Sequence, residues 1–205
     1  IASSEYGSLE QAVASLTVFA HPETVHETRC SNVFKVVRAA TRDERDTYAD
    51  HPLCGRVMRD DNHSPTMAFT WVHGLNRRPL DVQFNHIWPR SSDVSAYTNL
   101  ANLCMMPAYL SKLSDTDETV CALLRYRAFQ LYSGCNDFNA DITPEPPDTY
   151  HDIRWANTLP TIGDPEAVYR EAMRTRPLNR TTRSAREIGW VFSDFQPDPE
   201  LSDGG

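Results

Sequence analysis

The stretch that decides the fold runs from Leu80 to Asp115 and reads LDVQFNHIWPRSSDVSAYTNLANLCMMPAYLSKLSD. Apolar and polar residues alternate over 80–86, which predicts a strand that ends at His86. A polar loop then leads to a second short strand at 99–104, and a helix is expected from Pro107. The predicted order is therefore strand, loop, short strand and helix.

The composition is that of a globular protein. The chain has 205 residues, of which 40% are hydrophobic and 10% aromatic, enough for one domain with its own core. No apolar run is long enough to span a membrane. The formal net charge of −8 lowers the expectation of nucleic-acid binding, although segregated charge permits it. Arg greatly outnumbers Lys, which is explained by base composition at least as well as by phosphate binding.

The chain start and the cysteines favour a cytoplasmic protein. Residues 1–4 lack the basic and apolar regions of a signal peptide. The five cysteines are odd in number and widely spaced, and no pair has the C-x-x-C spacing. This pattern favours reduced thiols over a disulfide framework or a structural zinc site.

Four consecutive regions of a single domain, 1–205, are expected. Residues 1–66 are predicted to be helical, with one helix opened by Ser8 and another by Ser31. Residues 67–134 are predicted to hold an antiparallel hairpin, the stretch quoted above and a following helix. The hairpin would pair a strand at 67–73 with the strand at 80–86.

The C-terminal half continues this pattern. The helix after Asp115 is expected to end near Gly134. Residues 135–196 form a Pro-rich segment followed by helices, the first of which would be capped by Asp164 with Pro165 at its first position. The last residues, 197–205, read as a disordered tail.

Two motifs within 80–115 carry a resemblance to a known family. They are Asn85-His86-Ile87-Trp88-Pro89 and, with Asn99 13 residues after His86, the segment NLANLC. Together they resemble the metal finger of HNH (His-Me finger, ββα-metal) endonucleases. The resemblance implies that His86 is a general base and that Asn99 holds the loop through bonds to the backbone. The remainder of the chain resembles no family.

The sequence departs from the family pattern at two positions. Asn85 stands where the family usually has Asp, and Ala108 stands where a helix ligand is expected. Ser111 is the nearest oxygen one turn further along the predicted helix, so Asn85 and Ser111 are the predicted metal ligands. Two alternatives stay open: Asp81, or a remote acid such as Asp60 or Asp61, replaces the helix ligand, or the site is inactive.

Hydrolysis of a phosphodiester needs an activated water, a base and a cation that takes up negative charge. Mg²⁺ or Mn²⁺ is the expected ion, because such ions accept oxygen ligands and Mg²⁺ keeps several waters. Basic side chains near the finger and on the C-terminal helix are expected to contact phosphates. These are Arg77, Arg78, Arg90, Lys112, Arg170 and Arg174.

The sequence thus predicts an α+β protein, mostly α-helical, with a central ββα-metal finger and a small antiparallel hairpin. The predicted function is metal-dependent cleavage of nucleic acid, double-stranded DNA in preference to RNA. One alternative is an inactive HNH-like module that binds nucleic acid or a protein partner. Another is a small-molecule hydrolase that uses His86 with Asp81 or Asp93. Base specificity and oligomeric state are left undetermined.

Overall fold

The computed structural model describes residues 5–75, 80–135, 143–161 and 163–192. The chain is an α+β protein in which helix exceeds strand. Its helices are α1 (Leu9–Leu16), α2 (Pro22–Glu27), α3 (His63–Val72), α4 (Leu113–Thr116), α5 (Glu118–Leu131), α6 (Pro165–Thr175) and α7 (Arg180–Ile188). Its strands are β1 (Val18–Phe19), β2 (Val36–Arg38), β3 (Tyr48–His51), β4 (Gly55–Asp60), β5 (Val82–His86) and β6 (Leu103–Pro107). Short 3-10 turns lie at Leu100–Asn102 and Tyr150–Asp152.

The central sheet has the order β1-β6-β5, and both pairings are antiparallel. In the β5–β6 pair, Asn85 lies opposite Cys104 and His86 opposite Leu103. The strand expected at 80–86 is therefore present as β5, but the pairing with 67–73 is wrong. The partner of β5 is β6, which lies after the loop, and α4 follows β6 along the chain.

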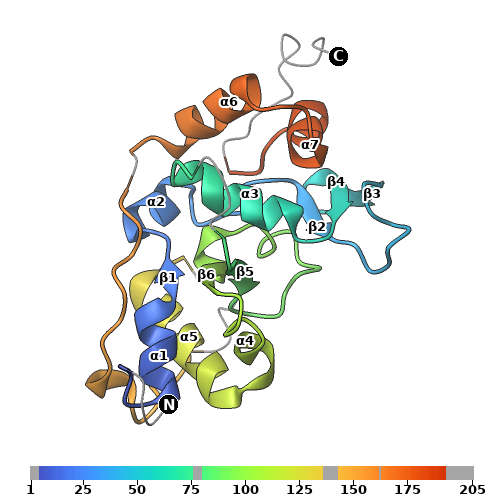
Figure 1. Cartoon of the computed structure of the whole chain (residues 1–205). Coiled ribbons are helices and arrows are strands. Elements are labelled where there is room, and N and C mark those ends of the chain that lie inside the picture. The colour runs from blue at the N-terminus through green and yellow to red at the C-terminus, as the bar shows by residue number, and fades with distance from the viewer. Residues whose placement is uncertain (1–4, 76–79, 136–142, 162, 193–205) are drawn as a thin grey trace.

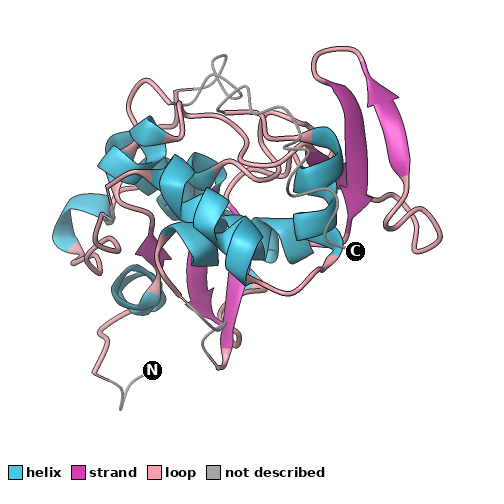
Figure 2. Cartoon of the chain, turned by 90° about the horizontal axis from the view of Figure 1, so that it is seen from above, coloured by secondary structure: helices cyan, strands magenta, loops and turns pink. Residues whose placement is uncertain are grey.

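The second sheet has the order β2-β4-β3, with β2 parallel and β3 antiparallel to β4. The β3–β4 hairpin stands at one edge of the molecule (Figure 1) and projects beyond the helices when seen from above (Figure 2). Because β4 ends at Asp60 and α3 begins at His63, the sheet delivers the chain directly to the central helix.

The predicted strand at 67–73 is wrong, because these residues belong to helix α3. The Asp60 carboxylate accepts a hydrogen bond of 2.5 Å from the Ser64 backbone N–H, which satisfies an N–H in the first turn of α3. Side chains around most of α3 are buried, from Ser64 to Val72. A helix buried on several faces has no clear polar face, so its pattern was mistaken for strand alternation.

The predicted helix after Ser31 is also wrong. This segment contains β2 and two isolated bridges, Asn32 to Asn99 and Phe34 to Trp190. Side chains compete with helical hydrogen bonds here, since the Thr98 hydroxyl accepts from the Phe34 N–H at 3.0 Å. Thus residues distant in sequence fix this backbone as extended.

The helix expected from Pro107 begins later, at Leu113. Pro107 instead ends β6, where it lies opposite Val82. Proline lacks a backbone N–H and is compatible with a strand end. The residue at the family's ligand position, Ala108, therefore lies in the connection before α4 and not on a helix.

Three expected helices are present with their N-terminal signals. The Ser8 hydroxyl accepts from the Gln11 N–H, and the Asp164 carboxylate accepts from the Ala167 N–H, with Pro165 opening α6. Helix α5 is capped by Asp117 and ends at Leu131. Such caps use contacts within four residues, which explains why they are readable from sequence. The predicted tail at 197–205 lies outside the described residues.

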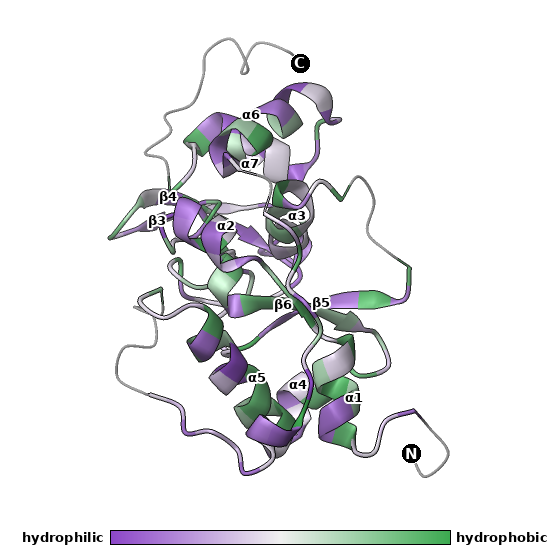
Figure 3. Cartoon of the chain, turned by 90° about the vertical axis from the view of Figure 1, so that its left-hand side faces the viewer, coloured by the Kyte–Doolittle hydropathy of each residue, from purple (hydrophilic) through white to green (hydrophobic). Residues whose placement is uncertain are grey.

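The core lies between the central sheet and the surrounding helices. Its largest fully buried side chains are Trp71, Trp190, Tyr97, Tyr132, Tyr169, Phe19, Phe34, Phe69, Met58, Leu100, Leu103 and Met106. Helices α6 and α7 lie at one end and α1, α4 and α5 at the other, with β5 and β6 between them (Figures 1 and 3). None of the described helices is long and apolar enough to cross a membrane.

The prediction of reduced cysteines is wrong for one pair. Cys30 and Cys135 form a disulfide, while Cys54, Cys104 and Cys121 are free. The odd count and wide spacing concealed this pair, because its members are 105 residues apart and meet only through the fold. The cytoplasmic location stays a prediction.

Candidate functional site

His86 lies at the end of β5, and its ring is held by the loop that follows. Its Nε2 lies 2.9 Å from the carbonyl oxygen of Tyr97, and the two rings stack with an interplanar angle of 9°. A carbonyl accepts but never donates, so the Nε2 must carry a hydrogen. The Nδ1 of the neutral ring is then the unprotonated nitrogen, which is the form a general base requires.

The surroundings of His86 favour its neutral state. Burial lowers the pKa of its imidazole, and the Arg38 guanidinium lowers it further. The Tyr97 carbonyl and the Asp115 carboxylate raise the pKa, but burial is the largest cause and the net direction is downward. His86 is therefore able to accept a proton at neutral pH.

His86 lies at a cavity of about 280 Å³ between the end of β5 and the helices α4 and α5. Its lining residues are Arg38, His86, Ile87, Pro89, Ser91, Ser114, Asp115, Cys121 and Arg125. The cavity thus combines a neutral imidazole with one carboxylate and two guanidinium groups. These are the groups needed to handle a phosphate and a nearby cation.

Both arginines of the cavity are anchored by neutral oxygen acceptors. Arg38 donates to the Asn62 side-chain oxygen at 2.8 Å, and Arg125 donates from Nε to the Ile87 carbonyl at 3.4 Å. Neither of these contacts neutralises a guanidinium charge. Positive charge therefore remains at the rim of the His86 cavity, where an anion would be attracted.

Two buried asparagines fix the loop between β5 and β6. Asn99 donates from Nδ2 to the Cys30 and Ser95 carbonyls, and its Oδ1 accepts from the Ala101 N–H. Asn102 accepts from the Trp88 N–H at 2.8 Å and donates to the Trp88 and Ala96 carbonyls. The backbone bonds expected of Asn99 are present. Asn102 makes three bonds from its side chain to the backbone, as Asn99 does, and fixes the same loop.

The two predicted metal ligands do not line the His86 cavity. Asn85 donates from Nδ2 to the Ser111 carbonyl at 3.4 Å and lines a different cavity of about 480 Å³, together with Asp61 and His63. The Ser111 hydroxyl donates to the Ala108 carbonyl at 2.8 Å. Because successive strand residues point to opposite faces, Asn85 and His86 diverge.

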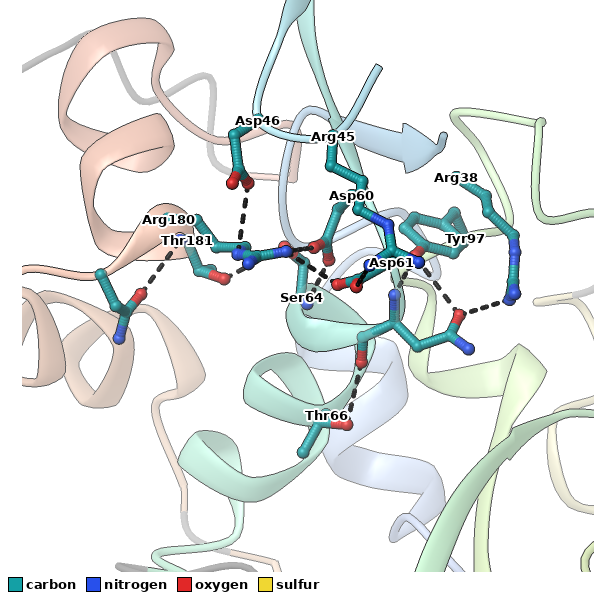
Figure 4. Close-up of polar contacts among 12 residues, drawn as sticks. Arg38, Arg45, Asp46, Asp60, Asp61, Ser64, Thr66, Tyr97, Arg180 and Thr181 are labelled. Carbon is teal, nitrogen blue, oxygen red and sulfur yellow. Dashed lines mark hydrogen bonds and ion pairs between the residues drawn. The ribbon is translucent and has the colours of Figure 1, made fainter. Parts of the chain in front are cut away.

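The remote acids Asp60 and Asp61 belong to a charged network that joins β4, α3 and α7 (Figure 4). Arg180 contacts Asp46, Asp60 and Asp61 at 3.2, 3.4 and 2.8 Å. Arg45 adds a second contact of 2.8 Å to Asp61. These carboxylates are already neutralised, which disfavours them as metal ligands. Asp81 is exposed at the turn before β5, where its carbonyl accepts from the Ala108 N–H.

Asn62 connects this charged network to the His86 loop. Its backbone N–H donates to the Tyr97 hydroxyl at 2.7 Å, and its side chain accepts from Arg38. Burial raises the pKa of the Tyr97 phenol, so the hydroxyl stays protonated. One residue therefore orients both Tyr97, whose carbonyl holds His86, and Arg38, which lines the cavity (Figure 4).

The predicted phosphate-binding residues are spread over the molecule. Arg77 and Arg78 lie outside the described residues. Arg90 is paired with Asp93 at 3.7 Å, and Arg170 with Glu166 at 2.6 Å. Lys112 and Arg174 are exposed, on the connection before α4 and on α6. Of the predicted set, Lys112 is the nearest in sequence to the α4 residues that line the His86 cavity.

The structure adds four residues to the site that the sequence did not assign to it. They are Arg38, Tyr97, Asp115 and Arg125. Arg38 comes from β2, a segment predicted as helix, so no local signal could have found it. Asp115 lies in α4, seven residues after Ala108, and the later start of this helix displaced it from the expected position. Tyr97 acts through its backbone, which leaves no trace in residue type.

Comparisons with models of known protein families, with curated proteins and with solved structures found no match to this chain.

Proposed function

We propose that this chain is a metal-dependent endonuclease that hydrolyses phosphodiester bonds, with double-stranded DNA as the expected substrate and His86 as general base. One observation carries the proposal. The Nε2 of His86 is fixed on a backbone carbonyl, and the ring lines a cavity shared with Asp115, Arg38 and Arg125. The order of an antiparallel strand pair followed by a helix, with His at the end of the first strand, also agrees with the resemblance to HNH endonucleases.

The protein groups divide the work as follows. The Nδ1 of His86 takes a proton from a water molecule whose oxygen attacks phosphorus, while the bond from phosphorus to the leaving oxygen breaks. The leaving oxygen takes a proton from solvent. Arg38 and Arg125 hold the phosphate, because a guanidinium donates two parallel hydrogen bonds to an anionic group. The Tyr97 carbonyl keeps the base in the required tautomer.

Asp115 is the residue that fits a divalent ion in this cavity. Its carboxylate is exposed, lines the cavity with His86 and raises the pKa of that histidine, as a neighbouring negative charge does. A bound Mg²⁺ or Mn²⁺ would take up negative charge on the phosphate. Because Mg²⁺ retains several waters, one carboxylate with substrate oxygens is a sufficient donor set. This assignment replaces the Asn85 and Ser111 pair.

The direct test is cleavage of plasmid DNA by the purified chain with Mg²⁺, with Mn²⁺ and with a chelator. His86→Ala is expected to lower the rate by about 10²–10⁴-fold, the usual contribution of a general base. Asp115→Asn is expected to lower it and to raise the metal concentration needed. The matched control is His151→Ala, an exposed histidine on a 3-10 turn outside the cavity. Equal rates for His86→Ala and the wild type would contradict the proposal.

A second candidate function is an inactive HNH-like module that binds nucleic acid. The divergence of Asn85 from His86 and the absence of an oxygen side chain at Ala108 favour it. This candidate predicts DNA binding without metal-dependent cleavage. The plasmid cleavage assay separates the two, because only the first candidate predicts metal-dependent hydrolysis. A mobility-shift assay of the wild type and of Arg38→Gln and Arg125→Gln tests the DNA binding that both candidates predict, and the variants should bind more weakly.

A further inference from the structure

His26, Cys30 and Cys135 form a compact group away from the His86 cavity. Their ligand atoms all lie within 4.8 Å of one another. The Nδ1 of His26 is 3.6 Å from the Cys30 sulfur and 3.3 Å from the Cys135 sulfur. The imidazole therefore contacts both sulfurs of the disulfide and not one alone. We infer that, when the disulfide is reduced, these three side chains bind a thiophilic divalent ion, Zn²⁺ in particular.

The spacing of the three atoms agrees with zinc coordination. Zinc is bound tetrahedrally, with bonds of about 2.3 Å to sulfur and about 2.0 Å to nitrogen, so neighbouring ligand atoms lie roughly 3.5–3.8 Å apart. The two distances from nitrogen to sulfur in the group are close to this value. Zinc coordination then requires the two sulfurs to separate after reduction, by rotation of the two cysteine side chains.

The backbone around His26 and Cys30 is fixed independently of the disulfide. Helix α2 ends in a Schellman motif, in which the Cys30 N–H bonds the Val25 carbonyl and the Arg29 N–H bonds the His26 carbonyl. Arg29 and Cys30 both have positive φ, at 54° and 53°. A left-handed conformation at non-glycine residues is uncommon and is retained only where the surroundings impose it.

Cys30 and Cys135 are also anchored from outside the group. The Cys30 carbonyl accepts from the Asn99 side chain at 2.8 Å. Cys135 is fully buried after α5, and its N–H donates to the Tyr132 carbonyl at 2.8 Å. Both cysteines thus keep their places when the S–S bond breaks, which pre-organises the thiolates for a metal ion.

Replacement of the disulfide by a bound zinc ion takes place in two steps. A dithiol reductant gives two electrons and two protons to the Cys30–Cys135 disulfide and becomes a disulfide itself. Binding of Zn²⁺ then releases the two thiol protons and leaves a neutral group of one ion, two thiolates and one imidazole. Thiolate and imidazole ligands select zinc over Mg²⁺, so this site and the oxygen-ligand site proposed at Asp115 would hold different ions.

The test uses Co²⁺ as a spectroscopic probe for zinc, added to the whole chain after reduction by a phosphine and again after oxidation. We expect one equivalent bound with tetrahedral ligand-field bands and a thiolate charge-transfer band in the reduced protein alone. Zn²⁺ should displace the Co²⁺. Absence of thiolate bands in the reduced protein, or equal binding by the oxidised protein, would overturn the inference.

Variants assign the ligands. His26→Gln, Cys30→Ser and Cys135→Ser are each expected to weaken binding by more than about 100-fold, the upper end of the loss caused by removing an outer-shell partner. The matched control is the Cys54 and His51 pair, whose sulfur and Nδ1 lie 3.7 Å apart without belonging to the group of three. Cys54→Ser should bind as the wild type does, and loss of binding in this variant would contradict the assignment. If Cys30→Ser does not fold, the redox comparison in the wild type still decides.

Discussion

The loop that holds His86 and the network around Arg180 are built from opposite chemistry. In the loop, Asn99 and Asn102 are fully buried and bond to backbone groups, with no ion pair in these contacts. In the network, Asp60 is fully buried and Arg180 reaches three carboxylates. Both regions converge on Tyr97 through Asn62, so they are two supports of one site.

The difference explains how charge is made available near His86. Neutral amides satisfy the backbone of the loop without placing a fixed charge beside the imidazole, so burial can dominate the pKa of His86. In the network, Arg45 and Arg180 offset most of the charge of Asp46, Asp60 and Asp61, and these residues do not line the His86 cavity. Arg38, Arg125 and Asp115 then remain able to face an incoming anion or cation.

The largest effect on stability is expected from Asn102→Ala. The change removes three buried hydrogen bonds, one from the Trp88 N–H and one to each of the Trp88 and Ala96 carbonyls, which keep their bonds from the Arg90 and Asn99 N–H groups. Since each buried hydrogen bond contributes about 0.5–1.5 kcal/mol, a loss of about 3 kcal/mol in the free energy of unfolding is expected in urea titrations. Asn85→Ala, which removes one long bond at a half-buried site, is the control and should cost less than about 1 kcal/mol. Similar losses of stability in Asn102→Ala and Asn85→Ala would show that the buried bonds of Asn102 contribute no more than the single long bond of Asn85.

A smaller loss of about 2 kcal/mol is expected from Arg180→Met. The fully buried Asp60 then keeps its bond from the Ser64 N–H but loses its ion pair. Breaking a fully buried pair costs about 3–5 kcal/mol, and the 32% exposure of the Arg180 side chain reduces that figure. Arg170→Met, which breaks an exposed pair with Glu166, should cost about 0.5 kcal/mol in the same titration. An equal loss of stability in both variants would show that the ion pairs of Arg180 contribute no more than an ordinary exposed ion pair.

Two buried histidines, His86 and His73, should make the stability of the folded chain sensitive to acid. Burial lowers the pKa of His86 and of His73 in the folded chain below the ordinary value of 6.5. The unfolded chain then binds more protons in the range just below pH 6.5, so stability is full above that pH and falls as the pH drops through this range. The slope is at most about 1.4 kcal/mol per pH unit for each histidine.

Unfolding titrations of His86→Gln between pH 5 and pH 8 (roughly the window in which histidine titrates) check this expectation. The variant should lose part of the acid sensitivity that the wild type shows. In the proposed enzyme, the same lowered pKa predicts that the cleavage rate falls to half of its maximum at a pH below 6.5. If the free energy of unfolding of His86→Gln changed with pH as steeply as that of the wild type, His86 would not be a cause of the acid sensitivity.

The smallest effect is expected from Ser111→Ala. Its hydroxyl makes one bond, to the Ala108 carbonyl, in the connection before α4. The free energy of unfolding should change by less than about 0.5 kcal/mol, as for most surface substitutions. The cleavage rate should not change either, since Asp115 and not Ser111 lines the cavity. If cleavage by the Ser111→Ala variant needed a higher metal concentration, Ser111 would again be a candidate metal ligand.

The sequence was informative where contacts are local. The strand that ends at His86, the Asn99 segment and the caps Ser8 and Asp164 depend on residues close in the chain. It was uninformative where distant segments decide. The sequence of helix α3 shows no clear helical periodicity of polar and apolar residues, because most of its faces are buried. Strand β2 forms because it pairs with β4.

The candidate site divides in the same way. His86 and Asn99 could be proposed from their motif, whereas Arg38 and Arg125 reach the cavity only through the packing of β2 and α5. Asp115, the proposed ligand, lies on α4, which begins only at Leu113 because β6 continues to Pro107. The motif therefore indicated His86, the proposed base, but not the groups that surround it.

The disulfide gives the chain a covalent ring of its own. It joins positions 105 residues apart, and the closed segment contains α3, β5, β6 and α4. A peptide bond cut by a protease anywhere between Cys30 and Cys135 would leave both fragments in one molecule. Such a nicked chain would run as a single species in a denaturing gel until a thiol is added, and as two species afterwards. The sequence around His86 is thus tethered at both sides for as long as the S–S bond lasts.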